Sequence, residues 1–85
     1  MSYRLVRKKD GLVKQSKKVC YLSFFENGTF RKKHYKAKIG RCLLMSPFSR
    51  YFTWQTTLIT KIIEEKKNYI RFTTENSEYE LFTED

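Results

Sequence analysis

Residues 69–81 read YIRFTTENSEYEL, and their alternation of apolar and polar side chains decides the fold class. Ile70 and Phe72 alternate with Tyr, Arg and Thr in the first half, and Tyr79 and Leu81 alternate with glutamates in the second. A period of two is typical of antiparallel strands with one buried face. The Glu-Asn-Ser segment between the halves favours a turn, since Asn tolerates a positive φ. The stretch therefore predicts two paired strands whose Ile, Phe, Tyr and Leu face a core.

The residues before this stretch predict a third strand. Residues 52–63, FTWQTTLITKII, are rich in Thr, Ile and aromatic side chains, which favour a pleated surface. The polar segment 64–68, EEKKN, follows as a turn. Apolar residues within 52–63 fall on both parities, so the pattern does not select an inward face. Residues 51–85 are predicted to form a three-stranded antiparallel meander.

Two hairpins are predicted in the N-terminal half, at Asp10-Gly11 and Asn27-Gly28. Both dipeptides supply the positive φ that tight hairpin turns require. The first separates strands over 3–8 and 12–14; the second separates strands over 19–25 and 29–35.

The expected fold is mainly β, with five to seven short strands in a small antiparallel barrel or curled sheet of SH3-like or OB-like type. One short helix over residues 33–45 is the open alternative to strand structure there. Gly40 opposes it, because Gly inside a helix costs about 1 kcal/mol relative to Ala. The 85 residues, 1–85, are expected to be a single domain.

The N-terminus lacks the apolar segment of a secretory signal, and no run approaches the roughly 20 apolar residues of a membrane span. Cys20 and Cys42 each lie in an apolar run, where a free thiol behaves as a small hydrophobe. We expect both to be buried and reduced, with a reactive or disulfide-bonded pair as the alternative. A cytoplasmic location follows, in the host cytoplasm if the chain is phage-encoded.

Charge is distributed unevenly along the chain. The net charge is +9, yet residues 1–50 hold fourteen Lys and Arg against two acids, while residues 51–85 hold four against seven. Such asymmetry indicates one surface suited to polyanions and another that is neutral or acidic.

The segment 30–38, FRKKHYKAK, is the leading candidate for a nucleic-acid site. Cations along an extended strand can follow successive phosphates, and an interleaved ring can stack on a base. In an extended chain Lys32, His34, Lys36 and Lys38 would share one face. The competing interpretation is a solvated edge strand, because edge lysines also block unwanted strand pairing. The predicted phosphate contacts in this segment are Arg31, Lys32, Lys33, Lys36 and Lys38.

Further basic residues would widen this patch. Closure of the first hairpin would gather them on one rim, with a flexible basic arm as the alternative. Tyr35 and Tyr51 are predicted to stack on bases, while Phe52 and Trp54 are expected in the core. The additional predicted contacts are Arg4, Arg7, Lys8, Lys17, Lys18 and Arg50.

Catalytic and metal chemistry are not expected. His34 is the only histidine, so a two-histidine ribonuclease mechanism cannot occur within one chain. Cys20, Cys42 and His34 lack metal-ligand spacing, and no phosphate-binding or dinucleotide motif implies a cofactor. The acidic C-terminal residues are interpreted as a solubilising face. Their alternative role is a surface for a basic partner or for self-association.

Residues 54–81, from WQTTLIT (54–60) through TENSEYEL (74–81), resemble a pattern of small phage and mobile-element proteins, in which a W-x-T-S/T-x-I strand precedes a T-x-N-S-x-Y-x-L strand. The similarity covers about a third of the chain and carries no site residues. In size, basicity and Lys/Asn/Glu-rich composition the chain also resembles T-even phage early proteins that act against host enzymes or defences. One of these is an RNA-binding factor that neutralises a toxin–antitoxin endoribonuclease. The resemblance implies the same setting for this chain.

The leading hypothesis is therefore a non-enzymatic protein that binds RNA, or less favourably DNA, with little sequence preference and counters a host or defence enzyme. The first alternative is a protein inhibitor whose basic face covers an acidic surface of such an enzyme. The second is a nuclease toxin that uses His34 as its single acid or base.

Overall fold

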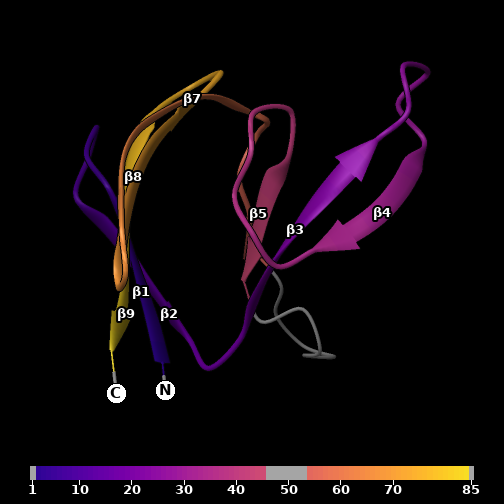
Figure 1. The fold of residues 1–85 in the computed structure, drawn as a ribbon. Coiled ribbons are helices and arrows are strands. Elements are labelled where there is room, and N and C mark those ends of the chain that lie inside the picture. Colours follow the sequence, from indigo (N-terminus) through magenta and orange to yellow (C-terminus); the bar gives the residue numbers. More distant parts are fainter. Residues whose placement is uncertain (1, 46–53, 85) are drawn as a thin grey trace.

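The computed structural model of the chain describes residues 2–45 and 54–84, and every regular element within them is a β-strand. The strands form two antiparallel sheets that face one another (Figure 1). Sheet A has the order β2-β1-β9-β8-β7, and sheet B has the order β4-β3-β5-β6. The strands are β1 (Ser2–Arg7), β2 (Leu12–Ser16), β3 (Val19–Phe24), β4 (Phe30–His34), β5 (Cys42–Met45), β6 (Trp54–Gln55), β7 (Ile59–Lys66), β8 (Tyr69–Thr74) and β9 (Glu78–Glu84).

The predicted mainly β class is confirmed, although the two sheets do not close into a barrel. Both predicted hairpins form, with Gly11 at φ 73° and Gly28 at φ 85° in their turns. The alternative helix over residues 33–45 is wrong, because residues 35–41 form an irregular link that leads into β5. The described part of the chain contains no helix of the length and apolarity needed to cross a membrane.

The predicted C-terminal meander is confirmed as β7, β8 and β9. Its inward residues are those that the alternation indicated. β7 continues three residues further than expected, so the turn after it is Lys67-Asn68. The buried inward residues are Ile70, Phe72, Tyr79 and Leu81.

The single strand predicted over residues 52–63 is wrong, because the described part of this segment changes sheets; residues 52 and 53 lie outside the described residues. Thr56 holds the chain on sheet B, since its N–H donates to the Leu43 carbonyl (2.9 Å) and its hydroxyl accepts from the Leu43 N–H (3.0 Å). The chain then enters β7, whose pairing with β8 shifts register twice. Each shift re-aims the following side chains, which explains why apolar residues fall on both parities.

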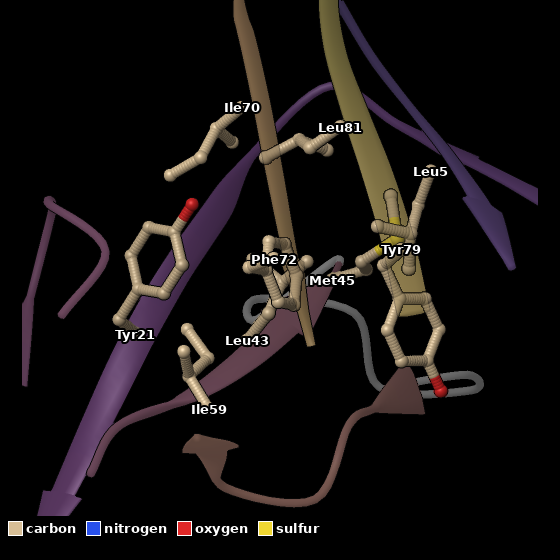
Figure 2. Packing of buried hydrophobic residues seen from close by; sticks show 9 residues of the cluster. All are labelled: Leu5, Tyr21, Leu43, Met45, Ile59, Ile70, Phe72, Tyr79 and Leu81. Atoms are coloured by element: carbon tan, nitrogen blue, oxygen red, sulfur yellow. The ribbon is translucent and has the colours of Figure 1, made fainter. Parts of the chain in front are cut away.

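The core lies between the sheets (Figure 2). Sheet A contributes Leu5 and the inward residues of β8 and β9, while sheet B contributes Tyr21, Leu43 and Met45. The rings of Phe72 and Tyr79 stack with centroids 5.6 Å apart. These large side chains allow so short a chain to bury a core.

Cys20 and Cys42 are free thiols, and both are buried, as the sequence predicts. Cys20 pairs across the ladder with Leu44, and Cys42 pairs with Leu22. Both cysteines therefore alternate with the core residues Tyr21 and Leu43 and belong to the opposite face of sheet B. Burial raises the pKa of both thiols, which disfavours the reactive thiolate.

We expect Leu43→Ala to lower the free energy of unfolding by about 2–5 kcal/mol, because it removes a fully buried side chain and leaves a cavity. Leu43 is 0% exposed and lies on β5, between β3 and β6. Urea unfolding followed by the fluorescence of Trp54 measures the change. The control is Val13→Ala on β2, where the side chain is 49% exposed and the expected change is below about 0.5 kcal/mol. Equal losses in the two variants would contradict this assignment of the core.

Candidate nucleic-acid interface

The cations predicted to bind nucleic acid are divided between the sheets. Arg4 and Arg7 on β1, with Lys8 directly after it, lie in sheet A, where β1 pairs with the acidic strand β9. Each of the three forms an ion pair inside the chain, which offsets its charge. The pairs are Arg4–Glu84 (3.4 Å), Arg7–Asp10 (2.7 Å), and Lys8 with Glu78 and Glu80 (3.9 Å each).

A second group of cations surrounds a hairpin that reaches away from sheet A. β3, β4 and the turn between them form this β3–β4 arm (residues 19–34), and its tip is the part farthest from β1 and β9 in Figure 1. Five cations on β4 and in the link after it form no ion pair with an acid within residues 2–45 and 54–84. We call them the arm patch: Arg31, Lys32, Lys36, Lys38 and Arg41.

His34 marks the point where the arm patch converges. The side chain is half-buried at the end of β4, and its Nε2 lies 2.8 Å from Ser23 Oγ on β3. Partial burial lowers the pKa of His34 below its ordinary value, and the positive charges of Arg41, Lys32, Arg31 and Lys38 lower it further. Since four cations act on one imidazole, an anion bound here would meet several positive charges at once.

Arg41 is a member of this patch that the sequence analysis missed. Gly40, at φ 91°, permits the turn that returns the chain to the arm, and Ile59 fixes that turn through backbone hydrogen bonds to Gly40 (2.9 Å) and Arg41 (2.8 Å). The Arg41 guanidinium donates to the Lys36 carbonyl (2.9 Å). The resulting hollow of about 450 Å³ is lined by Ser23, Phe24, Arg31, Lys32, His34, Lys38, Ile39, Gly40 and Arg41.

Exposed aromatic rings accompany the cations. Phe25 and Phe30 flank the arm's turn and are 55% and 56% exposed, and Tyr35 is 71% exposed directly after β4. Lys33 Nζ lies 5.6 Å from the centroid of the Tyr35 ring, and the Arg31 guanidinium lies 5.9 Å from that of Phe25. Cations and open ring faces are therefore adjacent along one hairpin, which is the combination that single-stranded nucleic acid requires. The sequence analysis selected Tyr35 but not the two phenylalanines.

The remaining predicted residues are dispersed. β4 ends at His34, so the expected alternation does not continue to Lys36 and Lys38, which lie in the link to β5. Lys17 and Lys18 lie in the connection between β2 and β3, where the Lys18 N–H donates to Ser16 Oγ (3.1 Å). The predicted contacts Arg50 and Tyr51 lie outside the described residues.

The acidic strand β9 already has partners within the chain. Glu78 contacts both Lys8 (3.9 Å) and Arg71 (2.6 Å), and Glu80 accepts a hydrogen bond from the Tyr69 hydroxyl (2.6 Å). Glu78 and Glu80 therefore contact cations and a tyrosine of sheet A, and their solubilising role stays a prediction.

Within the described residues, no three His, Cys, Asp or Glu side chains are grouped so that they could hold a metal ion. Comparison with known proteins finds no matching family model, no matching curated protein and no matching solved structure.

We expect the pKa of His34 to lie below 6.5 in the free protein and to rise as salt screens the surrounding cations. Removing one of these cations by Arg41→Gln should also raise it, whereas Lys9→Gln in the distant β1–β2 turn should not. NMR titration measures this directly, because the chain has one histidine and hence one signal.

The lowered pKa of His34 also predicts how the stability of the folded chain depends on pH. The unfolded chain binds the proton more tightly than the folded chain does, so the His34 contribution is present above pH 6.5 and is lost as the pH falls through the lower folded pKa. A pKa above 6.5 at low salt would contradict the convergence of cations on His34.

Proposed function

We propose that this protein binds single-stranded RNA with little sequence preference through the arm patch, which lies on the β3–β4 arm and in the link that follows it. The observation that carries the proposal is the arm patch, five cations without an acidic partner in the described chain, placed beside three exposed rings. Phosphate contacts would supply most of the affinity, and they carry no sequence information.

The distribution of ion pairs supports placing the RNA contact on the arm patch rather than on β1. The cations of β1 lie within 4 Å of carboxylates, so a phosphate would have to compete with an existing acid. The arm patch has no such competitor among the described residues. A bound phosphate would also relieve the mutual repulsion of its cations, which the lowered pKa of His34 reflects.

The exposed rings support a single strand over a duplex. Bases can stack on a protein ring only when they are unpaired, and single-stranded RNA offers such bases. The rings of Phe25, Phe30 and Tyr35 are too open to be part of the core. The resemblance to phage early proteins extends the proposal to its setting, in which the protein counters a host or defence enzyme such as a toxin endoribonuclease.

We expect the double variant Lys32→Glu/Lys38→Glu to abolish binding of a labelled oligo(U) in fluorescence anisotropy. Wild-type affinity should fall about 100-fold between roughly 50 and 200 mM salt, since five phosphate contacts give a logarithmic slope of about −3 to −4 for a single strand. The matched control is Lys9→Glu/Lys61→Glu, which makes the same charge change on sheet A and should retain most of the affinity. Equal losses in the two variants would show that net charge, and not the arm, binds RNA.

We expect Tyr35→Ala and Phe30→Ala each to weaken oligo(U) binding about 5- to 150-fold, because one stacked base contributes about 1–3 kcal/mol. Both rings are exposed, so the free energy of unfolding should change little, and urea unfolding provides that check. The salt slope should stay at its wild-type value, since no phosphate contact is removed. Unchanged affinity in both variants would contradict stacking on the arm.

The rival function is inhibition of an enzyme by direct protein contact, and the apolar tip formed by Phe25 and Phe30 is the observation that favours it. The absorbance spectrum of the protein purified at low salt distinguishes the two functions. Absorbance at 260 nm that ribonuclease and salt both remove supports RNA binding. A clean protein spectrum, together with no binding of oligo(U), would overturn the proposal in favour of the inhibitor.

A further inference from the structure

A second concavity opens beside the arm, between the two sheets. It encloses about 240 Å³. It shares Tyr35 and Lys36 with a further hollow at the end of β4, which is also lined by Lys32, Lys33, His34 and Arg41. Drug-sized ligands occupy about 300–1,000 Å³, so this pocket suits one small ring system. Its lining includes Tyr21 on β3, Glu65 on β7, Ile70 on β8 and Leu81 on β9.

The wall of this pocket combines apolar and aromatic side chains with charged ones. Ile70, Leu81 and Tyr21 belong to the core, and Figure 2 shows the Tyr21 hydroxyl directed away from Leu43 and Ile59, toward the end of the core where Ile70 lies. Burial raises the pKa of this hydroxyl, so it stays protonated, and the nearby Glu65 carboxylate raises it further. The pocket thus offers flat apolar contact together with a hydroxyl and a carboxylate.

The charged side chains that line the pocket indicate which class of ligand it suits. Aromatic pockets with a carboxylate can hold an alkylammonium group. Here, however, three lysines line the pocket beside Glu65. Lys66 is already paired with Glu64 (2.9 Å), so Lys36 and Lys67 provide the positive charge that disfavours a cationic ligand. A neutral ring attached to a phosphate fits better, because the lysines at the rim can contact the phosphate while the ring enters the pocket.

We infer that this pocket receives one unstacked pyrimidine base of the RNA held by the arm patch, and that Glu65 favours cytosine over uracil. A carboxylate accepts a hydrogen bond from the 4-amino group of cytosine, whereas uracil presents a carbonyl oxygen at that position. The inference rests on the proposed function and adds to it a base-specific site at a single nucleotide, while the remaining phosphate contacts stay tolerant of sequence.

The test compares oligo(C), oligo(U) and an abasic strand of the same length by anisotropy. Wild type should bind oligo(C) about tenfold more tightly than oligo(U), since a hydrogen bond to a charged group contributes about 1.5–3 kcal/mol. Glu65→Gln should remove most of this ratio. The matched control, Glu75→Gln, loses the same charge at an exposed position outside the pocket and should keep the ratio. Any purely electrostatic gain in affinity would appear in both variants.

A second readout locates the base. Addition of cytidine monophosphate should shift the methyl NMR signals of Ile70 and Leu81, which line the pocket, and leave those of the exposed Val13 unchanged. The base pocket would be overturned if wild type bound oligo(C) and oligo(U) equally and if Glu65→Gln left this ratio of affinities unchanged. RNA binding by the arm patch would then still stand. Failure of every strand to bind wild type would overturn both.

Discussion

Pairing of the first strand with the last organises this molecule. β1 lies between β2 and β9, so that Leu5 stands opposite Leu81 and both enter the core. The same ladder brings the N-terminal cations beside the C-terminal acids, and Arg4 also covers the ring of Phe82 at 4.4 Å. Most of the acids on β9 are thereby engaged within sheet A. Individual exposed ion pairs contribute at most about 1 kcal/mol each, so the ladder and the core, rather than these charges, hold the pairing in place.

This arrangement leaves the positive charge concentrated where sheet B ends. Six cations lie between residues 19 and 45, against Glu26 as the single acid of that segment. β4 is an edge strand, and lysines on an edge also prevent strand-to-strand aggregation. Protection of the edge and attraction of a polyanion therefore use the same side chains. The exposed rings distinguish the two roles. Protection of an edge does not require Phe25, Phe30 and Tyr35 to be in solvent, whereas base stacking does.

In the proposed function, the arm patch and the pocket between the sheets would contribute to RNA binding in different ways. Cations on a projecting hairpin act through charge, which is long-ranged and indifferent to sequence. The pocket acts through shape and hydrogen bonds, which are short-ranged and selective. Tyr35 and Lys36 line both the pocket and the hollow at the end of β4, so a strand lying on the arm would pass the mouth of the pocket.

The sequence by itself determined the β class, both glycine hairpins and the inward residues of β8 and β9, because period-two alternation and positive-φ turns are local properties. It also indicated the basic segment around β4. Only the tertiary structure decided which cations remain without acidic partners, since that depends on the β1–β9 pairing of residues about 75 positions apart. The sequence pattern likewise did not predict three other features: the change of sheet after β6, the bulges of β7 and the return of Arg41 to the arm. Each depends on hydrogen bonds between distant strands, which a local pattern does not encode.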